Sequence, residues 1–164
     1  LIYPRQLPRL FPYPSIRDTP QRIRPAYYYR QSAVIPYRVE QARLEILLVT
    51  SSKNRHWVVP KGIHDPGLSA HGSAEKEAFE EAGVRGEAAT QPLGQYQYPK
   101  WEATCEVHVF AMRVTEWLSP PEWQESQRQR CWMRVEDAVQ KLANRDLAQL
   151  AAGLPDWLER QQNG

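Results

Sequence analysis

One segment constrains the fold of this chain more than any other. In residues 58–84, a loop broken by prolines and glycines leads directly into a run of glutamates. Prolines and glycines interrupt regular structure in the first half, whereas the second half consists of good helix formers. A fold that contains this segment must join a loop to a short acidic helix, and must solvate or neutralise its carboxylates. The loop residues are Pro60, Gly62, Pro66 and Gly67, and the glutamates are Glu75, Glu77, Glu80 and Glu81.

The spacing of the glutamates becomes meaningful on a helix. We expect residues 73–82 to be helical and Gly83 to end the helix, because glycine adopts the left-handed conformation common at helix C-termini. Glu77, Glu80 and Glu81 then stand at i, i+3 and i+4, so their carboxylates share one face. A stripe of small residues at a spacing of four suits close packing against a sheet. This stripe consists of Ala74, Ala78 and Ala82.

Two interpretations of the shared acidic face remain open on charge alone. In the first, the carboxylates are solvated and Lys76 pairs with Glu80. In the second, a divalent cation neutralises the repulsion among the three carboxylates while Glu75 stays a solvated neighbour, and ligands that are all oxygen point to Mg²⁺ or Mn²⁺. Mg²⁺ usually also binds substrate phosphates, so the second interpretation implies phosphoryl or pyrophosphoryl hydrolysis.

Strand-forming segments surround the acidic segment. Residues 32–39 and 44–51 predict a hairpin that turns around residues 40–43, and residues 57–60 predict a short strand stopped by its proline. Three more apolar segments predict further strands, and the amphipathic spacing near the C-terminus predicts one helix ended by a glycine and a proline. The fold class is therefore α/β, with a mixed sheet. The later segments are residues 92–100, 103–116 and 131–135 for the strands and residues 136–154 for the helix.

The length and charge of the chain limit its class. The chain has 164 residues, enough for one domain, and a net charge of +2, which argues for neither nucleic acid nor a membrane surface as a partner. No apolar run reaches eighteen residues, so we expect no membrane span and a cytoplasmic protein. Dense prolines and arginines predict an extended or disordered arm over residues 1–27, followed by a domain over residues 28–164.

Counted from Gly62, the segment resembles the Nudix box. That 23-residue pattern is Gly, five residues, Glu, seven residues, then Arg-Glu-hydrophobic-any-Glu-Glu-any-Gly-hydrophobic. Seven of its nine defined positions match, and Leu68 and Lys76 replace the first glutamate and the arginine. In the family those two residues are mainly structural, and arginine's bidentate fork has no purpose once its carboxylate is lost. The matching residues are Gly62, Glu77, Ala78, Glu80, Glu81, Gly83 and Val84.

The resemblance implies a fold and an activity. Residues 32–150 are similar to Nudix hydrolases of diphosphoinositol and diadenosine polyphosphates, which implies an α/β/α sandwich. It also implies Mg²⁺- or Mn²⁺-dependent hydrolysis of a pyrophosphate bond in a nucleoside- or inositol-linked polyphosphate. Glu77, Glu80 and Glu81 would bind the metal, with the Gly62 carbonyl as a further ligand, and Glu77 could help to deprotonate the attacking water.

The substrate side is defined less sharply. Cations suited to phosphate oxygens stand at Arg38, Lys61, Arg128 and Arg130. Tyr96, Tyr98 and Trp101 either stack a nucleobase or pack within the domain. The expected partner is a small phosphorylated molecule, and capped RNA is the one nucleic acid that stays among the candidates. The alternative function is a Nudix-fold binding module with weakened catalysis, which Leu68 and Lys76 favour.

Overall fold

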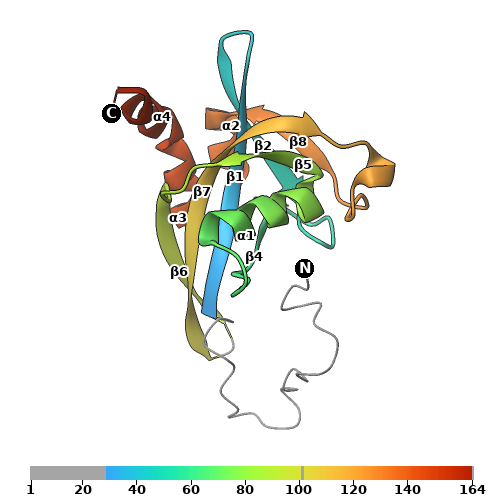
Figure 1. The fold of residues 1–164 in the computed structure, drawn as a ribbon, viewed down its shortest axis with the longest axis vertical. Helices are drawn as coiled ribbons and strands as arrows, with labels where there is room; N and C mark the ends of the chain where they lie inside the picture. The colour runs from blue at the N-terminus through green and yellow to red at the C-terminus, as the bar shows by residue number, and fades with distance from the viewer. Residues whose placement is uncertain (1–28, 101, 164) are drawn as a thin grey trace.

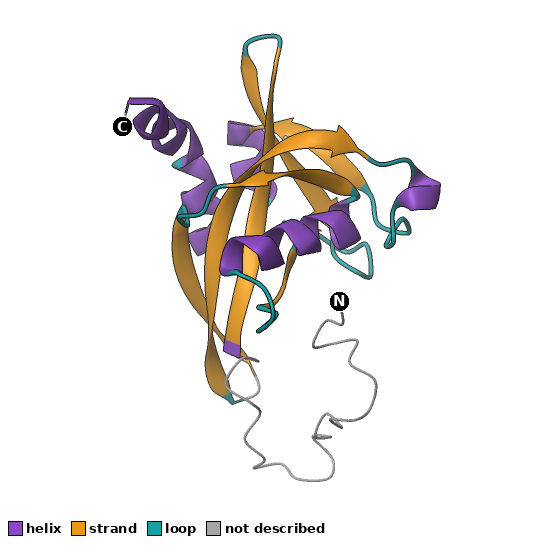
Figure 2. Cartoon of the chain, viewed as in Figure 1, coloured by secondary structure: helices purple, strands orange, loops and turns teal. Residues whose placement is uncertain are grey.

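The computed structural model describes residues 29–100 and 102–163. The predicted arm over residues 1–27 lies outside the described residues. In the described part, one mixed sheet lies between helix α1 on one face and helices α2, α3 and α4 on the other (Figure 1). This arrangement, coloured by element type in Figure 2, confirms the predicted α/β/α sandwich.

Eight strands and four α-helices lie in the part of the chain that the structure describes. The strands are β1 (Arg30–Glu40), β2 (Arg43–Thr50), β3 (Trp57–Val58), β4 (Lys61–Ile63), β5 (Val84–Ala88), β6 (Gly94–Lys100), β7 (Ala103–Trp117) and β8 (Arg130–Arg134). The helices are α1 (Ala70–Glu77), α2 (Val135–Lys141), α3 (Arg145–Ala152) and α4 (Leu154–Asn163). Helix α1 continues into a π-helical turn, η3 (Ala78–Ala82), and a short 3₁₀ helix, η4 (Pro120–Glu122), precedes β8.

The two long strands β1 and β7 run in parallel through the middle of the sheet. The central order is β3-β2-β1-β7-β5, with β4 paired to β1, β6 to β7 and β8 to β2. All pairs except β1 with β7 are antiparallel. The predicted hairpin of β1 and β2 is confirmed, and its turn places Gln41 and Ala42 at positive φ, as two-residue hairpin turns of the favoured hand require.

Side chains of the sheet alternate between two cores. Ala33 and Ile35 of β1 pack with the apolar faces of α2, α3 and α4, whereas Val34 packs on the side of α1. The predicted alanine stripe of Ala74, Ala78 and Ala82 lies in this second core. Alanine lets the helix backbone approach the sheet closely, so the glutamates of the same helix are held near the strands.

Two short strands were missed by the sequence prediction. β4 lies in the segment predicted as a loop, and β5 lies between the acidic helix and residues 92–100, where no strand was predicted. The expectation that Glu75 is a solvated neighbour is wrong as well, because its carboxylate accepts a hydrogen bond from the Ala88 N–H at 2.9 Å. The glutamate therefore ties α1 to β5.

The helix boundaries also differ from the prediction. Helix α1 begins three residues earlier than expected, because the Ser69 side chain accepts from the Gly72 N–H and caps it. The helical segment formed by α1 and η3 ends at Gly83, as predicted, where the glycine adopts a left-handed conformation with φ of 63°. The single C-terminal helix is wrong: Asn144 caps α3 through the Leu147 N–H and so separates α3 from α2. Pro155 stands in the first turn of α4, where proline is tolerated.

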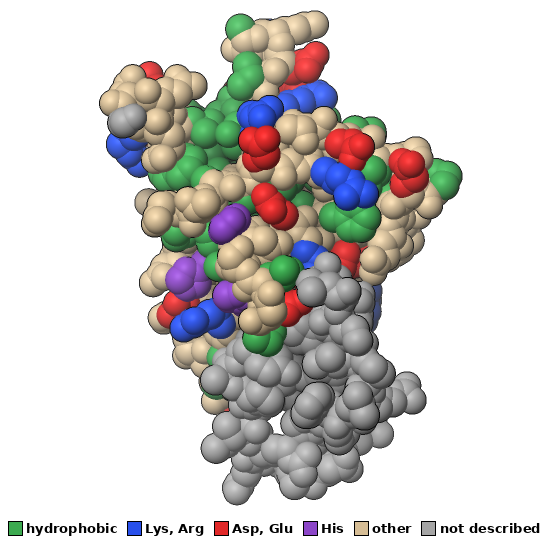
Figure 3. Space-filling model, viewed as in Figure 1, with side chains coloured by type: hydrophobic (Ala, Val, Ile, Leu, Met, Phe, Trp, Pro, Cys, Tyr) green, Lys and Arg blue, Asp and Glu red, His purple; other side chains and the backbone are tan. Residues whose placement is uncertain are grey.

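Among the described residues visible on this face of the molecule, acidic and basic side chains lie interspersed, as Figure 3 shows. Within the described residues, no helix combines the length and the apolarity that a membrane span needs.

Candidate active site

Glu77 is wedged against the backbone of β4. Its side chain is 1% exposed, and a methyl group added to Gly62 would lie 2.3 Å from Glu77 Oε2. Only glycine leaves this room, because no real side-chain carbon approaches so closely. The structure thus brings together Gly62 and Glu77, two of the residues predicted from the sequence as metal ligands.

Glu81 is held from two sides. The Lys61 backbone N–H donates to Glu81 Oε1 at 3.1 Å, and the Arg128 guanidinium lies 3.9 Å from Glu81 Oε2. The end of the acidic helix is therefore attached both to β4 and to the loop before β8. Residues far apart in the chain meet at this carboxylate.

Lys76 lies between the other two glutamates. Its ammonium nitrogen is 3.2 Å from Glu80 Oε2 and 3.4 Å from Glu77 Oε2. The predicted pair with Glu80 forms, but the idea of a solvated acidic face is wrong, because all of these side chains are at most 5% exposed. Burial keeps water from screening the charges, so the ammonium group of Lys76 reduces the repulsion between the carboxylates of Glu77 and Glu80.

The loop before the helix is anchored without the glutamate and arginine of the Nudix box. Asp65 Oδ1 accepts from the Gly67 N–H at 2.8 Å, and the Asp65 N–H donates to the Ser73 hydroxyl at 2.8 Å. These bonds tie the loop to the first turn of α1. The sequence analysis missed Asp65, although an Asp-Pro-Gly run is a recognisable turn signal.

The donors of this cluster fit a hard divalent cation by their chemistry. Three buried carboxylates beside a glycine backbone offer the oxygen ligands that Mg²⁺ and Mn²⁺ take. As they stand, no three acidic, histidine or cysteine side chains in residues 29–100 and 102–163 converge into a group that could hold a metal ion. The donors fit, but two of them are turned toward Lys76.

Lys61 is the predicted substrate residue with the most suitable surroundings. Its ammonium donates to the Tyr98 hydroxyl at 3.3 Å and lies 4.3 Å from the centre of that ring. Tyr98 in turn donates to Gln31 Oε1 at 2.8 Å. Burial lowers the pKa of Lys61, and the neighbouring Lys100 lowers it further, while Glu81 raises it. Sequence reasoning missed Gln31, because nothing in its position on a strand marks a polar partner.

Arg128 borders the cluster and also fixes its own loop. Two of its nitrogens donate to Glu125 Oε1, at 3.0 and 2.9 Å, and a third donates to the Thr50 carbonyl at 2.9 Å. The side chain is 9% exposed. The structure therefore places Arg128 beside Glu81, as a substrate role requires, with most of its donors engaged.

Arg130 caps the C-terminal end of the acidic helix. It donates to the carbonyls of Ala82, Gly83 and Leu118 at 3.0, 2.9 and 2.6 Å. The guanidinium also stacks on the rings of Trp117 and Trp123, at 3.6 and 4.3 Å from their centres. These contacts favour a structural role over the predicted phosphate contact, since both faces and most donors are engaged.

Arg38 lies in a separate hollow. It donates to Glu45 at 2.8 Å and lies 4.3 Å from the ring centre of Trp132. The hollow has a volume of about 370 Å³, and none of the three buried glutamates lines it. Its lining consists of Arg38, Val114, Thr115, Glu116, Trp117 and Trp132.

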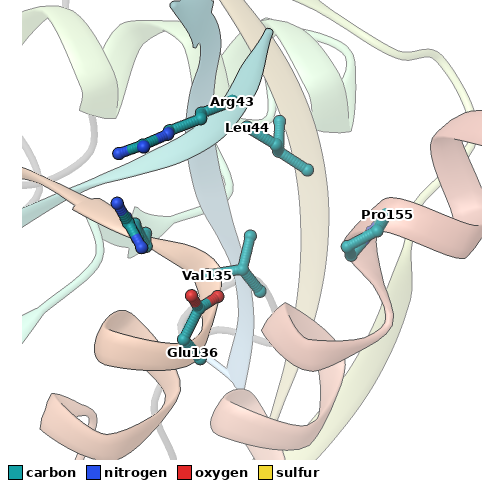
Figure 4. Close-up of a pocket in the computed structure, with 6 residues that line it drawn as sticks. Arg43, Leu44, Val135, Glu136 and Pro155 are labelled. Atoms are coloured by element: carbon teal, nitrogen blue, oxygen red, sulfur yellow. The ribbon is translucent and has the colours of Figure 1, made fainter.

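A second hollow lies near the start of β2 and the start of α2 (Figure 4). Its volume is about 290 Å³, and it too lacks the site glutamates.

Of the predicted stacking residues, Tyr96 is buried in the core, Tyr98 contacts Lys61, and Trp101 lies outside the described residues. The structure thus places Lys61, Gly62 and Arg128 beside glutamates of the acidic helix, whereas Arg130 caps the end of that helix and Arg38 lies in a separate hollow.

These features define the class of protein: an α/β/α sandwich domain whose acidic helix is packed against a glycine-bearing strand. The chain belongs to the NUDIX family, since the family model of the NUDIX domain matches residues 29–154. The relatives found for it carry hydrolase names, and the chain is accordingly a pyrophosphohydrolase by class.

Curated relatives support this assignment. The chain is 32% identical to "Nudix hydrolase 12, mitochondrial" of Arabidopsis thaliana, with 66% of this chain and 64% of that protein covered. It is 36% identical to "Diphosphoinositol polyphosphate phosphohydrolase 3-alpha" of Homo sapiens, with 72% and 71% covered. The chain thus spans somewhat less than two thirds of the Arabidopsis protein.

Solved structures share the fold. An Ap4A hydrolase of C. elegans in a binary complex has a TM-score of 0.65 and 23% identity, with 80% of this chain and 98% of that chain covered. A NUDIX-family hydrolase from Clostridium perfringens has a TM-score of 0.62 and 16% identity, with the same coverage. The cytoplasmic location expected from the sequence remains a prediction, and one relative carries a mitochondrial name.

Proposed function

We propose that this chain hydrolyses a pyrophosphate bond in a nucleoside- or inositol-linked polyphosphate, with Mg²⁺ or Mn²⁺ as cofactor. The observation that carries the proposal is the burial of three glutamates of one helix beside Gly62, in a member of the NUDIX family. The names of the relatives and of the C. elegans fold neighbour supply the two substrate classes.

In this proposal Glu77, Glu80 and Glu81 hold the metal, with the Gly62 carbonyl as a further ligand. A bound divalent cation supplies charge neutralisation on the polyphosphate and lowers the pKa of the attacking water. The protein contributes fixed donors: Gly62 leaves room for the carboxylate of Glu77, and the Lys61 N–H orients that of Glu81. Glu77 is the candidate for general base.

Lys61 is the cation best placed to hold a substrate phosphate. It is mostly buried, its backbone contacts Glu81, and Tyr98 and Gln31 orient its ammonium group. A cation that is partly stripped of water gains more from an anionic ligand than a fully hydrated one does. Arg128 is the second candidate, because it borders Glu81.

The test is a substrate panel assayed with Mg²⁺, with Mn²⁺ and with a chelator. The panel contains a diphosphoinositol polyphosphate, a diadenosine polyphosphate, a nucleotide sugar, ADP-ribose and capped RNA, and products are identified by mass. We expect metal-dependent cleavage of one class, reduced by about a hundredfold or more in Glu81→Gln. The matched control is Glu87→Gln, whose side chain is 76% exposed on strand β5.

Two outcomes would contradict the proposal. Cleavage that persists without metal, or that Glu81→Gln leaves unchanged, would remove the glutamates from the mechanism. Tight binding of one phosphorylated compound without any turnover would instead support the alternative, a Nudix-fold binding module. The observation that favours this alternative is the cation of Lys76 among the site carboxylates.

A further inference from the structure

We propose that Lys76 is a tethered counterion that competes with the divalent metal for the carboxylates of Glu77 and Glu80. The inference rests on the proposed function for the presence of a metal, and it concerns the regulation of that same site. It starts from one geometric fact: a single ammonium nitrogen lies within 3.4 Å of an oxygen of each glutamate.

The charges in this arrangement have little access to water. The side chains of Lys76, Glu77 and Glu80 are 5%, 1% and 3% exposed, so solvent screens their interactions weakly. Two carboxylates so close to each other repel, and one ammonium between them reduces that repulsion. Removing one partner of such a buried cluster leaves an uncompensated charge, so Lys76 stabilises the site while no other cation is bound.

Position 68 of the loop carries a half-buried leucine, so no carboxylate at this position draws Lys76 away from Glu77 and Glu80. The loop is anchored to the helix by Asp65 and Ser73 instead. A lysine is a compact point charge with rotatable donors, which lets it serve two neighbouring carboxylates at once. Compared with the glutamate and arginine of the Nudix box, Leu68 and Lys76 therefore alter the charge balance of the site and leave its carboxylate ligands in place.

The remaining glutamate is engaged as well. Glu81 accepts from the Lys61 N–H and lies near Arg128, while Glu77 and Glu80 face Lys76. Within the described residues, the three carboxylates do not converge into a metal-holding group. A metal ion has to displace the ammonium group, and by linkage the two cations weaken each other's binding.

The test measures metal affinity without substrate. Mn²⁺ is titrated into the full chain and followed by electron paramagnetic resonance of free Mn²⁺ and by calorimetry. We expect Lys76→Met to bind Mn²⁺ at least about tenfold more tightly than the wild type, because a nearby positive charge is removed. Lys53→Met, which changes an exposed lysine of the β2–β3 loop, should leave the affinity unchanged.

A second variant keeps the test informative if Lys76→Met folds poorly. Leu68→Glu combined with Lys76→Arg supplies a carboxylate on the loop for the cation at position 76. We expect this double variant to bind Mn²⁺ more tightly as well. With a chelator present, Lys76→Met should unfold at a lower temperature than the wild type, whereas the double variant should not.

The outcomes separate this inference from the proposed function. If the wild type binds Mn²⁺ and both folded variants bind it no more tightly, Lys76 does not compete and the inference is wrong, while the metal site stands. If neither the wild type nor any variant binds Mn²⁺ at millimolar concentration, the proposed cofactor fails and the inference fails with it.

Discussion

Three polar side chains connect strands that the sequence keeps apart. Lys61 of β4 donates to Tyr98 of β6, which donates to Gln31 of β1. Gln31 is 2% exposed, so this connection ends in the interior. Tyr98 can fill both roles only while its hydroxyl keeps its proton. The orientation of Lys61 therefore depends on the protonation state of a tyrosine.

The protonation of Tyr98 gives a prediction at alkaline pH. Burial raises the pKa of Tyr98 from 10.0 to about 12, with Cys105 adding to the rise. The pKa of Tyr98 is higher in the folded than in the unfolded protein. The contribution of protonated Tyr98 to the free energy of unfolding is therefore complete below pH 10 and is lost as the pH rises from 10 through 12. Tyr98→Phe should lose this pH dependence, so its free energy of unfolding should fall less over that range. Urea unfolding at several pH values measures both proteins, and equal slopes would contradict the assignment.

At the scale of elements, the acidic helix is held at both ends by side chains. Ser69 caps its start, and Arg130 donates to the carbonyls of Ala82 and Gly83 at its end. A cation at a helix C-terminus also interacts favourably with the helix dipole. The position of the glutamates along β4 thus depends on an arginine that lies 48 residues further along the chain.

Replacing this arginine should loosen the helix end. Arg130→Met leaves the carbonyls of Ala82, Gly83 and Leu118 without their charged donor, and we expect a loss of about 2–3 kcal/mol in the free energy of unfolding. Arg130→Lys keeps the charge but not the planar fork, so its loss should be smaller. Urea denaturation measures both variants. A loss below about 0.5 kcal/mol in Arg130→Met, the range of ordinary surface substitutions, would show that the carbonyls find other donors.

Element prediction succeeded where the signal is local. The hairpin and the helix end at Gly83 follow from strand propensity and from glycine's backbone freedom, and both are confirmed. β4 is only three residues long and exists through its pairing with β1, which no local pattern reveals. The break between α2 and α3 did have a local signal in Asn144, but the amphipathic spacing on either side concealed it.

At the scale of the molecule, the candidate site is a junction. Glu81 comes from the acidic helix, Lys61 from β4 and Arg128 from the loop before β8, and all three meet only in the folded chain. The two cores on either side of the sheet keep these elements together. A ligand that binds at the junction therefore binds the folded state and not the unfolded chain.

This coupling predicts that the metal stabilises the whole domain. At a metal concentration of about 100 times its Kd, mass action adds about 2.7 kcal/mol to the free energy of unfolding. For a domain of this size that corresponds to a rise in Tm of about 5–10 °C. Thermal unfolding with a chelator, with Mg²⁺ and with Mn²⁺ measures the shift, and Glu81→Gln should reduce it. Identical Tm values in all three conditions would argue against a metal site.

The candidate site could be predicted only in part. The spacing of Glu77, Glu80 and Glu81 from Gly62 is a local pattern. The structure places Glu77 against Gly62 and Glu81 against the adjacent Lys61 N–H, while Glu77 and Glu80 face Lys76. Burial of Lys76 and the capping role of Arg130 come from contacts between distant segments. A single sequence does not distinguish a buried cation from a surface one.

The stacking of Arg130 on two indole rings has an optical consequence. Trp123 is 6% exposed and Trp117 is 48% exposed, and the same guanidinium touches both rings and the end of the acidic helix. Any motion that separates this helix end from the sheet changes the surroundings of both fluorophores. Two of the six tryptophans of the chain therefore lie at the end of the acidic helix, so a movement of this helix end would change part of the intrinsic fluorescence of the protein.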